Sequence, residues 1–226
     1  MTPESGHALN PERLAYWYLR LNGFFLLENF IVHPDDGPSQ RTDADLLGVR
    51  FRNRAELPHD PMPDDQRVAG CTTLCNVVIG EVKSGPCALN GPWRREADHN
   101  INRVLSAIGC VRRESVDGAS TALYRTGAFQ DDSVTIRLVA FGDRRADIEP
   151  EVPQILFDEI LGFVFKRFRA YRRPKADVGN WAADGRELQR AFRESRGEDE
   201  FRRKARVLFK LRPDNAPRPA NGPGNA

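Results

Sequence analysis

Two apolar segments of the chain, residues 41–51 and 75–84, carry charged residues whose spacing could support chemistry. Both are rich in β-branched and aliphatic residues and end in charged or turn-forming ones, which predicts strands. Side chains two residues apart on a strand share a face. The charged residues in question are spaced in this way: Asp43 and Asp45, then Glu81 and Lys83. Charge on an apolar strand is costly when it is buried without a partner. If the two strands are neighbours, they bring these carboxylates and the ammonium to one point.

Such a point would suit a divalent metal ion with a lysine beside it. Carboxylate oxygens are preferred ligands of Mg²⁺, which keeps several waters and takes one or two protein carboxylates. Asp45 and Glu81 are the candidate ligands, and the Val82 carbonyl is a further one. A bound metal ion activates water and neutralises charge on a phosphate, and Lys83 could assist there. We therefore expect phosphodiester hydrolysis with Mg²⁺, for which Mn²⁺ can substitute.

An acidic residue at the start of one apolar strand, followed by Glu-x-Lys at the end of the next, resembles the PD-(D/E)xK nuclease superfamily. The resemblance covers roughly residues 10–140. It implies an α/β fold with a restriction-endonuclease-like core, in which helices flank a mixed central sheet. It also implies a Mg²⁺-dependent endonuclease that cuts DNA, less often RNA. The family's catalytic residues would fall on Asp45, Glu81 and Lys83.

The identity of the metal aspartate stays open between three residues. Ala44 stands where the family's name has proline, so Asp45 lacks the Pro-Asp pair. Asp43 shares the strand and the face of Asp45. Asp64 follows Pro63 and lies 17 residues before Glu81, but its surroundings have the composition of a loop.

Further candidate residues lie outside the two strands. Glu12 opens a predicted helix, as a glutamate often does in resolvase-like members of the superfamily, where it could be an outer metal ligand. A carboxylate favourable to the helix dipole explains Glu12 equally well. Basic residues near two predicted helix ends are candidates for contact with nucleic-acid phosphates: Arg94, Arg95, Lys166, Arg169, Arg172 and Arg173.

The order of predicted elements gives the domain organisation. We expect a flexible leader (1–9), a nuclease-like core (10–148), a helical C-terminal extension (149–211) and a disordered tail (212–226). Within the core, the expected elements are a helix, three strands, a helix opened by residues 90–93, and a strand pair at 121–129 and 133–141. The long connection 52–73 joins two strands that a short hairpin could join, which suggests a lid or substrate loop, or a disordered embellishment.

The overall composition is that of a globular domain. At 226 residues and a formal net charge of +2, the chain does not indicate a nucleic-acid partner by charge alone. The N-terminal residues do not have the pattern of a signal peptide and no apolar run could span a bilayer, so a cytoplasmic location without a membrane partner is expected. Reduced thiols are favoured for the four cysteines, with a zinc site at Cys71, Cys75 and His59 or Cys87 as an alternative.

Two other functions compete with the nuclease. The chain could be a non-catalytic nucleic-acid-binding or assembly subunit that retains the fold. It could also be a protein–protein module in which the Glu-x-Lys pair is only a cross-strand ion pair. Within the nuclease interpretation, the sequence shows no separate targeting module, which favours a protein partner or a homodimer.

Overall fold

The structure is a computed structural model that describes residues 9–32, 42–59 and 62–212. The helices are α1 (Pro11–Leu21), α2 (Gln66–Ala69), α3 (Asn100–Ile108), α4 (Val116–Thr126), α5 (Phe157–Ala170), α6 (Ala183–Arg193) and α7 (Glu198–Leu208). The strands are β1 (Phe25–Val32), β2 (Thr42–Phe51), β3 (Cys75–Val82), β4 (Ala128–Gln130), β5 (Val134–Gly142) and β6 (Gln154–Leu156). Short 3₁₀ turns are η1 (Gly91–Trp93), η2 (Glu96–Asp98) and η3 (Arg113–Ser115). The predicted leader and tail lie almost wholly outside the described residues.

Within these residues the strands form one mixed sheet of six strands in the order β1-β2-β3-β5-β4, with β6 beside β5. The first three strands are successive antiparallel neighbours. Strand β3 is parallel to β5, so the C-terminal ends of both strands lie at the same edge of the sheet. The beginning of β2 and the end of β1 meet at that edge too. The candidate residues Asp45, Glu81 and Lys83 were expected to meet at this edge.

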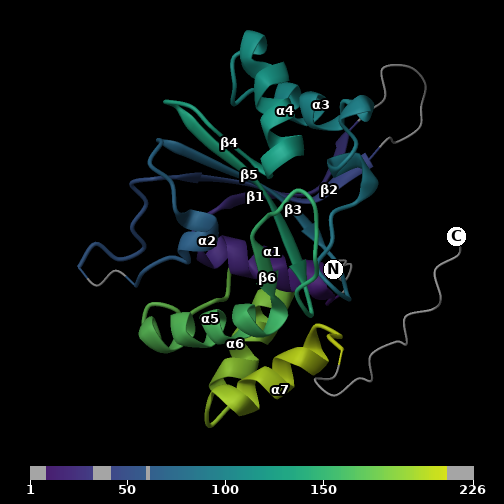
Figure 1. Ribbon diagram of the computed structural model, residues 1–226. Coiled ribbons are helices and arrows are strands. Elements are labelled where there is room, and N and C mark those ends of the chain that lie inside the picture. The colour runs from purple at the N-terminus through teal and green to yellow at the C-terminus, as the bar shows by residue number, and fades with distance from the viewer. Residues whose placement is uncertain (1–8, 33–41, 60–61, 213–226) are drawn as a thin grey trace, which may run out of the picture.

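Helices cover both faces of the sheet (Figure 1). On one face, α3 and α4 pack over a cluster that includes Val77, Ile79 and Leu138, here named the α3–α4 core. On the other face, α1 and α5 pack over Leu46 and Phe141, here named the α1–α5 core. An α/β architecture with a mixed, helix-flanked sheet is thus as the sequence predicted.

The ends of α1 follow the expected signals. The side chain of Asn10 accepts a hydrogen bond from the backbone of Arg13, and Pro11 occupies the first turn. After the helix, Gly23 has a φ of 84°, which glycine adopts without strain and which turns the chain into β1. Because α1 runs antiparallel to β1, the start of α1 lies at the same edge as the ends of β1, β3 and β5.

The region between β3 and β5 differs from its prediction. Residues 121–129, which contain the strand-favouring types Thr, Tyr and Phe, were expected to be a strand, but 121–126 belong to helix α4. The buried residues of α4 follow helical spacing and Gly127, at a φ of 71°, ends the helix. The preceding expected helix is likewise divided into η1, η2 and α3, and Ala97 is exposed.

The long connection 52–73 is anchored at the edge of the sheet opposite to Asp45 and Glu81. It joins the end of β2 to the start of β3, where Phe51 pairs with Cys75, so it begins and ends at the opposite edge. From there its described part packs against α5. Arg167 is fully buried and donates to the carbonyls of Met62 and Pro63.

Asp64, an alternative metal aspartate, is committed to this packing. Its carboxylate forms ion pairs with Arg50 at 2.6 Å, with Arg54 at 2.9 Å and with Arg167 at 2.8 Å. Charges this well buried need partners, and three arginines supply them. Asp64 therefore has a structural role and is removed from the catalytic candidates.

The C-terminal helices are packed against the rest of the molecule. Strand β6 extends the sheet, and α5 shares the α1–α5 core with α1, so the expected boundary between 148 and 149 falls inside one packed unit. Asp184 at the start of α6 accepts hydrogen bonds from Arg13 at 2.6 Å and from the Trp17 indole at 2.9 Å. These contacts join the first helix of the chain to the last quarter of it.

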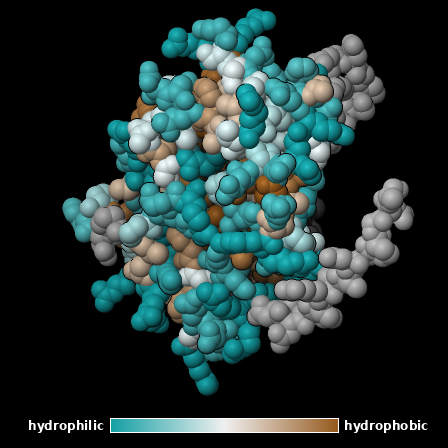
Figure 2. All heavy atoms as spheres, viewed as in Figure 1, coloured by the Kyte–Doolittle hydropathy of each residue, from teal (hydrophilic) through white to brown (hydrophobic). Residues whose placement is uncertain are grey.

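The described residues contain no helix long and apolar enough to cross a membrane. On the face shown in Figure 2, hydrophilic residues cover most of the surface and apolar residues show only in separate small areas.

Candidate active site

The candidate site is formed where β1 and β2 bend. Their register passes from Glu28–Leu46 to Phe30–Ala44, and Asn29 between these pairs has a φ of 49°. Asparagine tolerates this left-handed conformation better than most residues. The inward side chains change face across the bend: Leu46 contacts the α1–α5 core, whereas Phe30 and Ala44 contact the α3–α4 core.

Asp45 lies at this bend and its carboxylate reaches across to β3. Its Oδ2 accepts a hydrogen bond of 2.7 Å from the backbone N–H of Val82. The regular β2–β3 pairing ends just before, at Leu46–Gly80, so the Asp45 side chain continues the ladder in place of the backbone. The N–H and C=O of one strand residue face the same neighbouring strand. The Val82 carbonyl therefore lies on the Asp45 side of β3, as a ligand there would need.

Glu81 is almost fully buried, with 1% of the residue exposed. One carboxylate oxygen, Oε2, accepts a hydrogen bond of 2.8 Å from the indole N–H of Trp93, and the other, Oε1, forms an ion pair with the Lys83 ammonium. Lys83 is the more accessible partner, with 31% of its side chain exposed. The lysine thus lies between the buried glutamate and solvent.

Burial and nearby negative charge raise the pKa values of Glu81 and Asp45. The pKa of Glu81 is raised to about 7, first by burial and then by the charge of Asp45, although Lys83 and Trp93 favour its ionised form. Burial also raises the pKa of Asp45, and the Val82 N–H and Lys83 oppose this. The charge of Asp43 also raises the pKa of Asp45. These carboxyl groups form a local excess of negative charge that a cation would relieve.

Glu12 and Asp43 belong to the same electrostatic neighbourhood. The pKa of Glu12 is raised by burial and then by the charges of Asp45, Glu28 and Asp43. Glu12 stands in the first turn of α1. Since the charges that act on it belong to residues of β1 and β2, this turn faces the bend in those two strands. Glu28, in contrast, is ion-paired with Arg13. The charges of Asp43 and Asp45 thus act on Glu12, and the charges of Asp45 and Lys83 act on Glu81.

The donor chemistry fits a small divalent cation held by few protein ligands. Across residues 9–32, 42–59 and 62–212, no three His, Cys, Asp or Glu side chains converge into a ready ligand group. A Mg²⁺ ion does not need three, because it retains waters and is held by one or two carboxylates. Asp45, Glu81 and the Val82 carbonyl would hold it. Lys83 occupies Oε1 of Glu81, so a cation at that oxygen requires the ammonium to leave it.

The alternative zinc site is not formed by the predicted residues. Cys71 and Cys75 influence each other electrostatically, but Cys87 is buried in the α3–α4 core against the backbone of Gly142. The cysteines are free thiols.

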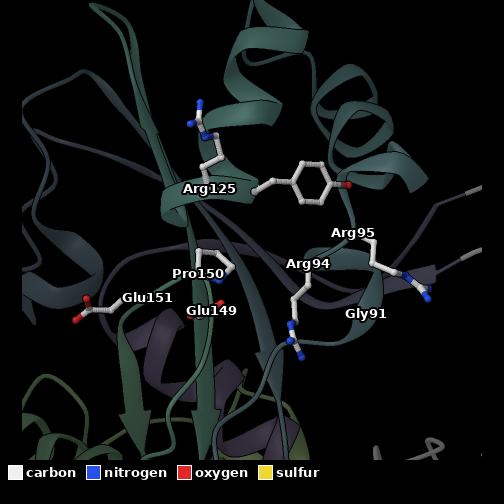
Figure 3. A pocket seen from close by; sticks show the side chains of 8 residues that line it. Gly91, Arg94, Arg95, Arg125, Glu149, Pro150 and Glu151 are labelled. Atoms are coloured by element: carbon white, nitrogen blue, oxygen red, sulfur yellow. The ribbon is translucent and has the colours of Figure 1, made fainter.

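The predicted basic residues divide into two groups. Arg94 and Arg95 directly follow Trp93 and line a cavity with Arg125, Tyr124 and residues 149–151 (Figure 3). The second group stands at the C-terminal end of α5 and just after it: Lys166, Arg169, Arg172 and Arg173. Helix α5 begins after β6, at the edge that holds Asp45 and Glu81, and its 14 residues span about 21 Å. The structure therefore places the second group away from Asp45, Glu81 and Lys83.

Trp93 is the site residue that sequence reasoning missed. It is buried, with 1% exposed. Nothing in the local sequence shows that its indole N–H meets Glu81, because the contact depends on the irregular chain path through η1. A buried tryptophan usually finds a hydrogen-bond partner, which was the one available signal.

Comparisons with known proteins add no family to this geometry. The chain matches no protein-family model, no curated protein and no solved structure.

Proposed function

We propose that this protein is a metal-dependent nuclease that hydrolyses phosphodiester bonds, with DNA as the favoured substrate. The observation that carries the proposal is the meeting of Asp45, Glu81 and Lys83 at one edge of the sheet, where the charge of Asp45 helps to raise the pKa of Glu81. The arrangement of a helix, three antiparallel strands and a later strand parallel to the third supports the likeness to PD-(D/E)xK nucleases.

Each residue has a distinct role in this proposal. Asp45, Glu81 and the Val82 carbonyl would hold Mg²⁺, and Glu12 would be an outer ligand. When bound, the ion activates a water and neutralises charge on the phosphate. Lys83 is the cation nearest to the two carboxylates and still reaches solvent, so it can bind a phosphate oxygen or orient the attacking water. Trp93 fixes one oxygen of Glu81 and so orients the carboxylate.

Cleavage of plasmid and single-stranded DNA with Mg²⁺ or Mn²⁺ tests the proposal. Wild type should cut, and Glu81→Ala or Lys83→Ala should lower the rate about 100-fold or more, as expected for loss of a metal ligand or a general acid–base group. The matched control is Glu200→Ala with Lys204→Ala, which removes an exposed ion pair of the same residue types on α7. Equal cutting by wild type and both site variants would refute the proposal.

A non-catalytic nucleic-acid-binding or assembly subunit is the competing function. It is favoured by one observation: both oxygens of Glu81 already have protein partners, Lys83 and Trp93. Calorimetric titration of Mg²⁺ and Mn²⁺ into wild type and Asp45→Ala separates the two functions. Metal binding that is lost in the variant supports the nuclease, and absence of binding in wild type supports the subunit.

A further inference from the structure

A hollow lies next to the candidate active site, between η1, the C-terminal end of α4 and residues 149–151 (Figure 3). Its volume is about 660 Å³, within the range of about 300–1,000 Å³ typical of ligand sites. Adjacent residues connect this hollow to the candidate site: Trp93 donates a hydrogen bond to Glu81, and the next residue, Arg94, lines the hollow.

Two elements supply the positive charge around this hollow. Arg94 and Arg95 come from the turn after η1, and Arg125 comes from the last turn of α4. All three are exposed. Arg95 is paired with Asp98 at 3.0 Å. Within the part of the chain that the structure describes, Arg94 and Arg125 have no acidic partner of their own, so their guanidinium groups are available to an external anion.

The backbone that carries these arginines is well fixed. The amides of Arg94 and Arg95 both donate to the carbonyl of Gly91 at 3.0 Å. Tyr124, the residue before Arg125, is 7% exposed, and its hydroxyl accepts a hydrogen bond of 3.1 Å from the backbone of Ile101. The Tyr124 hydroxyl also donates to the carbonyl of Pro92 in η1 at 3.4 Å, so the two elements that carry the arginines are joined to each other.

The directions of the side chains indicate the kind of anion. Figure 3 shows Arg94, Arg95 and Arg125 spread around the hollow rather than aimed at one point, with Glu149 and Glu151 along the remaining side. A single small anion would need converging donors, whereas a chain of successive phosphates can meet separate guanidinium groups in turn. The two glutamates repel a polyanion and so confine it to the arginine side.

We infer that this surface, named here the arginine rim (Arg94, Arg95 and Arg125), binds the phosphodiester backbone of a nucleic-acid strand. The rim holds the part of the strand that flanks the bond at Asp45, Glu81 and Lys83. The inference rests on the proposed function for its substrate class, and it adds Arg125 to the earlier expectation for Arg94 and Arg95. Binding at the rim needs no divalent metal.

Fluorescence anisotropy with a short fluorescein-labelled oligothymidylate in EDTA tests the rim without cleavage. The variant is Arg94→Ala with Arg125→Ala. We expect its affinity to fall about fivefold or more, and the slope of log K against log salt to decrease by about 0.7 for each lost phosphate contact. The control is Arg112→Ala with Arg113→Ala, which removes two exposed arginines at the start of α4, about 16 Å away along the helix. Circular dichroism confirms the fold of each variant.

The inference is overturned if wild type does not bind the oligonucleotide, if the rim variant loses less than about fivefold, or if the control loses as much. Metal-dependent cutting does not enter this comparison. A wild type that binds through the rim but cuts nothing would refute the nuclease alone, and a wild type that cuts with an unchanged rim variant would refute the rim alone.

Discussion

Replacement of Glu81 by glutamine should stabilise the metal-free protein at neutral and alkaline pH. Glutamine has nearly the shape of a protonated glutamic acid and can still accept the hydrogen bond from the Trp93 indole. It cannot ionise, so it avoids placing a negative charge at a position that is 1% exposed and close to Asp45. The ionised wild-type side chain does carry that charge.

The pKa of Glu81 sets the size and sign of the effect. The value is about 7 in the folded chain against an ordinary 4.5, so the folded state binds more protons than the unfolded state between these pH values. The free energy of unfolding of wild type therefore falls as pH rises through this window. At about 1.4 kcal/mol per pH unit, this carboxyl group costs about 3 kcal/mol above pH 7 and little below pH 4.5.

Urea denaturation in EDTA, at pH 4.5 and at pH 8, measures this difference. The stability of Glu81→Gln minus that of wild type should increase by about 3 kcal/mol from the lower to the higher pH. Glu114→Gln, which neutralises an exposed carboxylate, measures the effect of losing one charge at the surface. A difference between Glu81→Gln and wild type that is the same at both pH values would show that burial and Asp45 do not act on Glu81 as argued.

Other variants test the packing and the site in turn. Asp64→Asn leaves three arginines short of their common partner and should destabilise by about 3 kcal/mol in urea denaturation; an unchanged midpoint would contradict the buried network. Gly185→Ala would place a Cβ 2.0 Å from the Trp17 ring and should cost about 1–3 kcal/mol, whereas Gly118→Ala in open space on α4 should gain about 1 kcal/mol. A thermal melt of the two glycine variants checks that order. Trp93→Phe keeps the buried ring, removes its indole N–H and should slow metal-dependent cleavage about tenfold; an unaltered rate would remove Trp93 from the site.

The sequence predicted the chemistry-bearing strands because their pattern is local. Apolar alternation around Asp45 and the Glu-x-Lys at the end of the next strand are visible without tertiary structure, and both strands are found as neighbours. The bend at Asn29 was not predictable in this way. It depends on a left-handed residue in β1 and changes which face each side chain of β2 meets.

The two largest errors have tertiary causes. Residues 121–126 have strand-forming types, but Val116, Ala119 and Leu123 bury one helical face against the sheet, and burial overrides propensity. The connection 52–73 has the composition of an exposed loop, yet its charged residues find partners on α5, more than 100 residues further along the chain. Pairing between such distant charges leaves no local pattern.

These long-range contacts also affect when the protein can complete its fold during synthesis. The ribosome releases Glu56 and Asp64 well before their partners on α5, and α1 is released long before Asp184, which binds Arg13 and Trp17. Domains form as the chain emerges from the N-terminus, but here the first helix and the long connection must wait for residues beyond 160. A nascent chain that stops before α5 would expose much of one sheet face, so shortened products should aggregate rather than accumulate as a smaller stable domain.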